Sequence, residues 1–93
     1  MSYEIRLSSD AGVTLVKLPK PLRAHVLGHV QKLTDDPSSL SHPSHFPYPP
    51  DCQLSRPEPV KHEGEKHEFM ILFRYAADET SLQIIGIGHT IVE

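Results

Sequence analysis

The clearest pattern of apolar and polar residues lies in the C-terminal third of the chain. From Lys66 to Tyr75 both sets of alternate positions are largely apolar, and Ser81–Ile87 is a second apolar run that follows a turn-like Ala-Ala-Asp-Glu sequence. A strand that is apolar on both faces belongs in the middle of a sheet. We therefore expect a hairpin of two central strands, which Ile91 and Val92 extend.

Strand alternation assigns the side chains of the first of these strands to two faces. One face carries His67, Phe69, Ile71, Phe73 and Tyr75, and the other carries Glu68, Met70, Leu72 and Arg74. The second strand ends on Gly88-His89. His89 therefore leaves a buried strand after a glycine, at a place where its side chain can reach solvent and a substrate.

The first half of the chain predicts one strand and two helices. Residues 3–8 alternate apolar and polar, as in a half-buried strand. Ser9 or Asp10 is expected to cap a short helix over Ala11–Leu18. A second helix is expected over Pro21–Asp35, because proline suits the first turn of a helix. One stripe of this helix is apolar and should face a sheet: Leu22, Val26, Val30 and Leu33.

Proline dominates the segment between residues 38 and 59, which holds six of the nine prolines. Proline lacks an N–H donor and is excluded from helix interiors and central strands. We expect a long extended loop here, held to the body of the protein by Phe46, Tyr48 and Leu54. A short strand should follow over Val60–Glu63, with Gly64 supplying the positive φ of a tight turn.

Length and charge limit the choice of function. The chain has 93 residues, which predicts a single domain over 1–93, and its net charge of -3 argues against a generic nucleic-acid binder. A local basic face remains open, because several cations lie in or beside the hairpin: Arg56, Lys61, Lys66 and Arg74. Cys52 is the only cysteine, and neither a signal peptide nor a membrane-spanning run is evident. We expect a soluble, cytoplasmic protein.

Histidine is the residue type with the most chemical potential in this sequence, which contains seven. Their spacings lack the cysteines or acidic residues of a structural zinc site, so we predict neither a metal nor another cofactor. Histidine also suits general acid–base catalysis, since its pKa lies near neutrality. His89 is the best candidate, with His62, His67 and Glu68 as neighbours across the sheet. Lys61 and Arg74 are candidates to stabilise an anionic phosphate.

Several of these segments, taken in order, resemble the RelE/ParE superfamily of bacterial and archaeal toxins. The resemblance rests on four stretches: Tyr3-Glu4-Ile5, Leu15-x-Lys17-Leu18-Pro19-Lys20-x-Leu22-Arg23, Leu33-Thr34-Asp35-Asp36-Pro37, and Ile87-Gly88-His89. It implies an α+β fold in which two short N-terminal helices pack on a small antiparallel sheet, in the order β-α-α-β-β-β. It also implies a cognate antitoxin partner whose extended segment wraps the toxin.

The resemblance further implies an activity. RelE-like members cleave mRNA on the ribosome by attack of the substrate 2′-hydroxyl on the neighbouring phosphate, which inhibits translation and requires no metal. His89 matches the closing histidine of a YafQ-like branch, and Glu68 matches an acidic residue of that branch. The expected catalytic residues are His89, Glu68 and His67, and the expected substrate-binding residues are Lys61, His62 and Arg74.

Two positions depart from the family pattern. The family often has Tyr-Arg where this chain has Phe69-Met70, and a closing arginine where it has Thr90. Two interpretations therefore remain open. One is a metal-independent endoribonuclease or a weakened relative. The other is a non-catalytic binding module, either a ParE-like inhibitor of DNA gyrase or a degenerate toxin that binds only its antitoxin.

Overall fold

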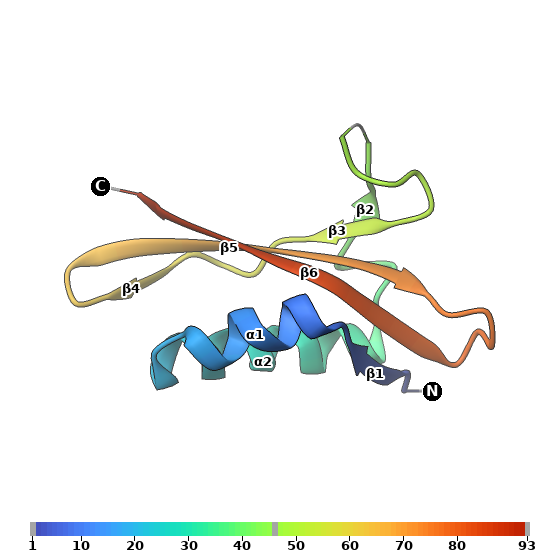
Figure 1. Ribbon diagram of the computed structural model, residues 1–93, viewed down its shortest axis with the longest axis horizontal. Helices are drawn as coiled ribbons and strands as arrows, with labels where there is room; N and C mark the ends of the chain where they lie inside the picture. The colour runs from blue at the N-terminus through green and yellow to red at the C-terminus, as the bar shows by residue number, and fades with distance from the viewer. Residues whose placement is uncertain (1, 46, 93) are drawn as a thin grey trace.

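A computed structural model describes residues 2–45 and 47–92 of the chain, so Phe46 lies outside the described residues. The elements follow in the order β1 (Glu4–Leu7), α1 (Ser9–Lys17), α2 (Lys20–Asp35), β2 (His42–Pro43), β3 (Gln53–Ser55), β4 (Val60–His62), β5 (Glu65–Tyr75) and β6 (Ser81–Val92). Both helices lie against one face of the sheet, and the loop between β2 and β3 rises from the other face (Figure 1). We call these the helix side and the open face.

The six strands form one sheet in the order β1-β6-β5-β3-β2, with β4 also paired to β5. The predicted central hairpin is confirmed, since β5 pairs with β6 on one edge and with β3 and β4 on the other. The α+β fold with two helices on a sheet is confirmed as well. One detail differs: β1 runs parallel to β6, so the sheet is mixed rather than purely antiparallel.

The two helices begin slightly earlier than predicted. Ser8, and not Ser9 or Asp10, caps α1: its backbone is extended and its hydroxyl accepts a hydrogen bond from the N–H of Ala11 at 3.1 Å. The second helix starts at Lys20, with Pro21 in its first turn, and ends at Asp35 as expected. Its predicted apolar stripe is buried against the sheet.

The core lies between the helices and the inner face of the central hairpin. Phe69, Ile71 and Phe73 of β5 are at most 2% exposed, and so are Leu82 and Ile84 of β6. They pack against residues of the helices: Ala11, Leu15, Leu18, Leu22, Val26, Val30 and Leu33. The face assignment made from strand alternation is therefore confirmed for the apolar residues of β5.

An extra residue in β6 interrupts the pairing of the central hairpin. Leu72 pairs with Gly86 but Phe73 pairs with Ile84, so Ile85 is the additional residue of a β-bulge. Paired residues share a face, and Phe69 of the core pairs with His89. Before the bulge the even-numbered residues of β6, such as Ile84, face the helices, and after it the odd-numbered residues do. His89 therefore lies on the helix side with Phe69.

The proline-rich segment is more regular than predicted. It contributes β2 and β3, and β3 pairs with β5 through Leu54 and Leu72. The expectation of a loop without strands over residues 38–59 was wrong, because Gln53–Ser55 contains no proline and can complete a ladder. Leu54 is 1% exposed and holds the segment to the sheet as expected.

Candidate functional site

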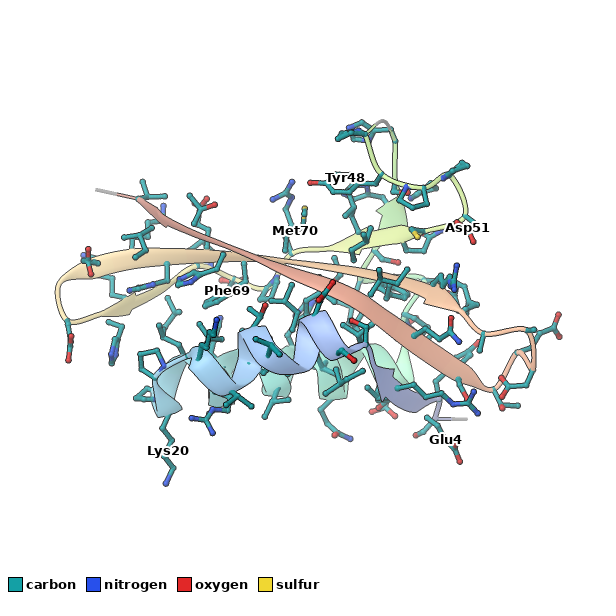
Figure 2. All side chains as sticks on the ribbon, viewed as in Figure 1. Glu4, Lys20, Tyr48, Asp51, Phe69 and Met70 are labelled. Atoms are coloured by element: carbon teal, nitrogen blue, oxygen red, sulfur yellow. The ribbon has the colours of Figure 1, made fainter. Side chains whose placement is uncertain are left out.

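The predicted site residues fall into two groups on opposite faces of the sheet. His67 and His89 lie on the helix side, whereas Glu68 pairs with Thr90 on the open face. Figure 2 shows the same division at the next two residues of β5: Phe69 points toward the helices and Met70 toward the loop that carries Tyr48. His89 and Glu68, which the sequence suggested as neighbours, therefore belong to adjacent strands, but their side chains lie on opposite faces of the sheet.

Three histidines lie close together on the helix side, and we call His62, His67 and His89 the histidine cluster. Nδ1 of His67 and Nε2 of His89 are 2.8 Å apart and share a hydrogen bond. The ring of His89 stacks on Phe69 with centroids 4.5 Å apart. The ring of His62 meets that of His67 edge-on at 6.0 Å. The cluster thus links a buried histidine to one at the surface.

Burial and charge favour the neutral form of His89. Desolvation lowers the pKa of His89, and the neighbouring His67 lowers it further. His67 itself is 4% exposed, and its Nε2 makes no hydrogen bond within residues 2–45 and 47–92. The imidazole of His89, which is kept neutral and held by one hydrogen bond, can accept a proton from a substrate.

A cleft of about 390 Å³ opens on the other face, and we call it the open-face cleft. Its lining comes from the β2–β3 loop, the residue after β3, and the central hairpin: Tyr48, Arg56, Glu68, Phe69, Met70, Gly88, His89 and Thr90. Arg56 supplies a cation and Glu68 a half-buried carboxylate. Nζ of Lys66 lies 3.8 Å from Oε1 of Glu68. His89 borders this cleft although its ring stacks on the helix side.

The three predicted substrate-binding residues are also divided. Lys61 pairs with Lys66, which places it on the open face with Glu68. Arg74 lies further along the same face, where its Nε donates to Oε1 of Gln83 at 2.8 Å. His62 belongs to the histidine cluster. No group of three histidine, cysteine or acidic side chains suited to a metal ion occurs within residues 2–45 and 47–92.

Arg56 and Tyr48 line the open-face cleft, although the sequence pattern did not predict them as site residues. Both reach the open-face cleft because β3 pairs with β5 and carries its flanking residues across the open face. In the sequence, Arg56 was noted only as one of several cations in or beside the central hairpin. The two departures from the family pattern, Met70 and Thr90, line this same cleft. Arg56 is therefore the cation available where the expected arginines are replaced.

Comparisons with known proteins identify the fold. No protein-family model matches the sequence, and no curated protein matches it significantly. The toxin–antitoxin complex RelBE2 of Mycobacterium tuberculosis matches in structure with a TM-score of 0.77 and 20% identity, over 97% of this chain and 100% of that one. The chain has the RelE fold.

Two E. coli structures agree with this result. A double arginine mutant of toxin RelE in the free state aligns with a TM-score of 0.64 and 13% identity, over 95% of this chain and 83% of that one. The intact RelBE toxin–antitoxin complex aligns with a TM-score of 0.62 and 14% identity, over 94% and 95% of the two chains. The RelE-like fold implied by the sequence resemblance is thereby confirmed. Within residues 2–45 and 47–92, neither helix has the length and apolar character needed to cross a bilayer.

Proposed function

We propose that this chain is the toxin of a type II toxin–antitoxin module and that it cleaves ribosome-bound mRNA in the open-face cleft, in the cytoplasm. The RelE fold supports the toxin assignment, and two of the similar structures are complexes with an antitoxin. The observation that carries the proposed chemistry is the open-face cleft, which holds Arg56 and Glu68 and is bordered by His89.

The proposed reaction is a transesterification within the RNA. The 2′-oxygen of one nucleotide attacks the adjacent phosphorus, the bond from phosphorus to the 5′-oxygen breaks, and a cyclic phosphate and a free 5′-hydroxyl result. A base must accept the proton of the 2′-hydroxyl, an acid must protonate the 5′-oxygen, and a cation must stabilise the charge that develops on the phosphate. Protein side chains can supply all three.

Arg56 and Glu68 are the residues that we assign to the reacting phosphate. The guanidinium of Arg56 is exposed at the cleft and offers paired N–H donors that match phosphate oxygens. Glu68 is only half-buried and its ion pair with Lys66 is long, so its carboxylate is free to accept a proton. Lys61, paired with Lys66 on the same face, adds positive potential that attracts RNA.

His89 is the second acid–base group in the proposal. It is exposed and it borders the open-face cleft. Beyond Ile84, β6 pairs only with β5 among the described strands, so its other edge is open where His89 lies. RNA that leaves the cleft over this edge of β6 would meet the imidazole. His67 acts through His89 by fixing its ring with the 2.8 Å hydrogen bond, so we assign it a positioning role.

Cleavage of mRNA on purified ribosomes, mapped by primer extension, tests this proposal. Arg56→Ala should lower the cleavage rate by about 10²–10³-fold, and Glu68→Gln and His89→Gln should each lower it by about 10²-fold or more. Lys32→Ala, which removes a cation from an exposed site on α2, is the matched control and should cleave like the wild type. Intact mRNA with the wild-type protein would contradict the proposal.

The roles of the two histidines need a separate readout. If His67 positions His89, His67→Gln should shift the pH dependence of the cleavage rate, because the neighbour that lowers the pKa of His89 is removed. A His89→Gln variant that cleaves like the wild type would remove His89 and His67 from the mechanism and leave the cleft residues in place.

A further inference from the structure

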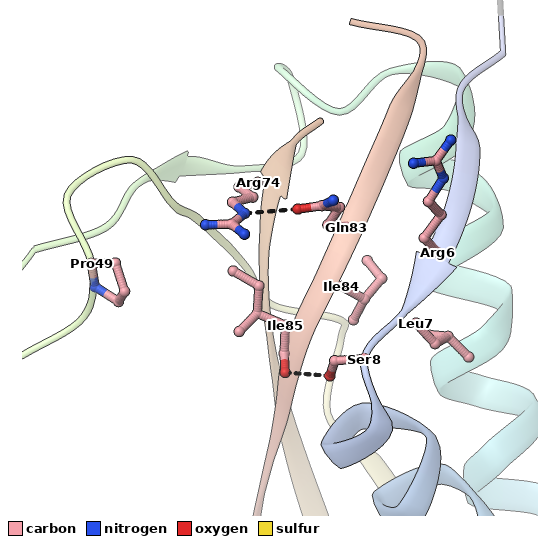
Figure 3. A pocket seen from close by; sticks show the side chains of 8 residues that line it. All are labelled: Arg6, Leu7, Ser8, Pro49, Arg74, Gln83, Ile84 and Ile85. Atoms are coloured by element: carbon pink, nitrogen blue, oxygen red, sulfur yellow. Dashed lines mark hydrogen bonds between the residues drawn. The ribbon is translucent and has the colours of Figure 1, made fainter. Parts of the chain in front are cut away.

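We propose that a second cleft on the open face, around Gln83, binds a nucleotide of the same RNA strand that flanks the one cut in the open-face cleft. This proposal rests on the proposed function. The second cleft has a volume of about 410 Å³ and is lined by Arg6, Leu7, Pro49, Arg74, Gln83 and Ile85, among others. Figure 3 shows Gln83 between the two arginines, with Arg74 joined to it by a hydrogen bond.

The sheet register brings the two guanidinium groups to one place. Gln83 pairs with Arg6 of β1 on one side and with Arg74 of β5 on the other, so the three residues form a row across three strands of the open face. Neighbouring strands lie about 4.8 Å apart, so the Cα atoms of the two arginines are roughly 10 Å apart. Side chains as long as arginine can therefore converge on a single phosphate above Gln83.

Both arginines are available to a ligand. Nη2 of Arg6 lies 3.2 Å from a carboxylate oxygen of Asp78, and Nη1 of Arg74 lies 3.5 Å from one of Asp51. The side chains of Arg6 and Arg74 are 56% and 46% exposed, and ion pairs at such exposed sites contribute little stability. The two non-bridging oxygens of an RNA phosphodiester, which share one negative charge, can accept hydrogen bonds from these guanidinium groups in place of the carboxylates.

Apart from Ser8, the other residues that line the second cleft are apolar, which suits a nucleobase as well as a phosphate. Pro49 and Ile85 supply an apolar wall, whereas Leu7 pairs with the core residue Ile84 and turns its side chain to the helix side. Unpaired bases in single-stranded RNA bind by their flat faces to apolar and aromatic side chains, while cations hold the backbone. Two cations beside an apolar wall therefore match one nucleotide better than they match a free anion.

One loop borders both clefts, which is why we assign the second cleft to the same RNA strand. Tyr48 lines the open-face cleft and the next residue, Pro49, lines the second cleft. Glu68 lines the open-face cleft and Arg74 lines the second cleft. Both are even-numbered residues of β5, so they lie on the same face of the sheet. An RNA strand that passes under the β2–β3 loop can occupy both clefts at once.

RNA binding by oligomers of two lengths tests this inference. The protein carries Glu68→Gln to prevent cleavage, and the probes are fluorescein-labelled single-stranded RNAs of about four and about ten nucleotides, whose lengths are chosen to fill one cleft or both. The double variant Arg6→Ala/Arg74→Ala should bind the long RNA about tenfold more weakly and the short RNA unchanged. The slope of log affinity against log salt should fall by about 0.7 for each phosphate that the variant no longer binds.

Controls separate this site from general charge and from misfolding. Lys17→Ala/Lys32→Ala removes the same charge from exposed sites on the helices and should leave the binding of both RNAs unchanged. Asp51→Asn frees Arg74 and should tighten binding of the long RNA, an effect that a damaged fold would not produce. Arg6→Ala alone, which breaks only a surface pair, should give an intermediate loss, and thermal midpoints report whether each variant is folded.

Three outcomes would overturn the inference. If the Arg6→Ala/Arg74→Ala variant and its lysine control bind the long RNA equally, the second cleft is not an RNA site, and the proposed function stands. If the double variant loses affinity for hexaglutamate but keeps its affinity for long RNA, the cleft recognises acidic protein segments instead. If the parent protein binds neither RNA and the wild type cleaves no mRNA, the proposed function fails as well.

Discussion

Nδ1 of His67 and Nε2 of His89 lie 2.8 Å apart across the two central strands, and this hydrogen bond joins a buried ring to an exposed one. Only one proton can lie between the two nitrogens. Protonating both rings would direct two N–H groups at each other and place two positive charges within hydrogen-bonding distance. The folded protein therefore disfavours a second positive charge on this pair, and because the pKa of His89 is lowered, its stability should depend on pH.

We predict that the free energy of unfolding falls as the pH is lowered below about 6.5. Burial and then His67 lower the pKa of His89 from its usual 6.5, and burial, Lys32 and His25 lower that of His29. In the unfolded chain both histidines bind protons near the usual pKa, so the unfolded state takes up more protons below it. The stabilisation is fully present above the unfolded pKa and is lost as the pH falls through the folded pKa. Urea midpoints from about pH 8 to about pH 5 measure this effect.

Replacing His89 measures how much of the pH dependence of stability comes from this histidine. His89→Gln should reduce the pH dependence of the urea midpoint to the part that His29 contributes, and His42→Gln, at an exposed residue of β2, should leave it unchanged. Asp78 does not interfere, because hydrogen bonds from Thr80 and Ser81 lower the pKa of its carboxyl below 3.8, outside the scanned range. A His89→Gln variant with the wild-type pH dependence would contradict the prediction.

The sequence could predict the central hairpin but not the face on which His89 lies. Alternation along β5 separated His67 from Glu68 correctly, since that strand is regular. In β6 the run Ile84-Ile85 is apolar at both positions, so hydrophobicity does not show which residue is extra. The bulge is set by how β5, β6 and the N-terminus of α1 fit together, and such contacts between distant segments leave no local pattern.

The proline-rich segment shows a second limit of the sequence pattern. Its composition indicated an extended loop, but three residues without proline pair with the long strand and carry Arg56 and Tyr48 to the open face. Strand propensity in so short a run is decided by the neighbouring strand rather than by the run itself. The cation and the aromatic residue of the proposed site were therefore visible as residue types but could not be placed.

The bulge itself leads to a prediction about register. Deleting Ile85 removes the extra residue, so Gly86 follows Ile84 directly and the pairs of the later residues with β5 are kept, with Ile87 and His89 still on the helix side. The deletion does remove the carbonyl that accepts a hydrogen bond from the Ser8 hydroxyl, so it should cost about 1–2 kcal/mol and leave folding cooperative. Ile85→Ala keeps the number of residues and should cost about 1 kcal/mol. Urea unfolding of both variants makes the comparison, and a deletion that prevents cooperative folding would show that the later residues of β6 lose their pairing with β5.

Ser8 joins α1 to the bulge, and we predict that it contributes through both of its hydrogen bonds. Its hydroxyl accepts from the N–H of Ala11 at 3.1 Å and donates to the carbonyl of Ile85 at 2.6 Å (Figure 3). Ser8→Ala should lower the free energy of unfolding by about 1–2 kcal/mol. Ser8→Asp keeps the acceptor but has no proton to donate, so its effect should be smaller and should come from the hydrogen bond to Ile85 alone.

The neighbouring serine is the control for this cap. Ser9 is exposed, and sequence alone offered it as a possible cap, yet the structure assigns that role to Ser8. Ser9→Ala should change the free energy of unfolding by less than about 0.5 kcal/mol. Equal destabilisation by the two alanine substitutions, measured by urea unfolding, would show that the cap shifts between them.

The turn between β4 and β5 offers a stabilising substitution. Glu63 has φ 51° and Gly64 has φ 80°, so both central residues of this two-residue hairpin lie in the left-handed region of a type I′ turn. Asparagine tolerates this conformation far better than glutamate. Glu63→Asn should therefore raise the free energy of unfolding by about 0.5 kcal/mol, and Gly64→Ala should lower it by about 1 kcal/mol.

A second asparagine substitution separates backbone conformation from charge at this turn. The carboxylate of Glu63 lies 3.9 Å from His62 at an exposed site, so removing this ion pair should cost little. Glu65→Asn makes the same chemical change in β5, where asparagine is disfavoured, and should destabilise the protein. Urea midpoints that fall equally for Glu63→Asn and Glu65→Asn would mean that the missing carboxylate, and not the backbone conformation, decides the effect.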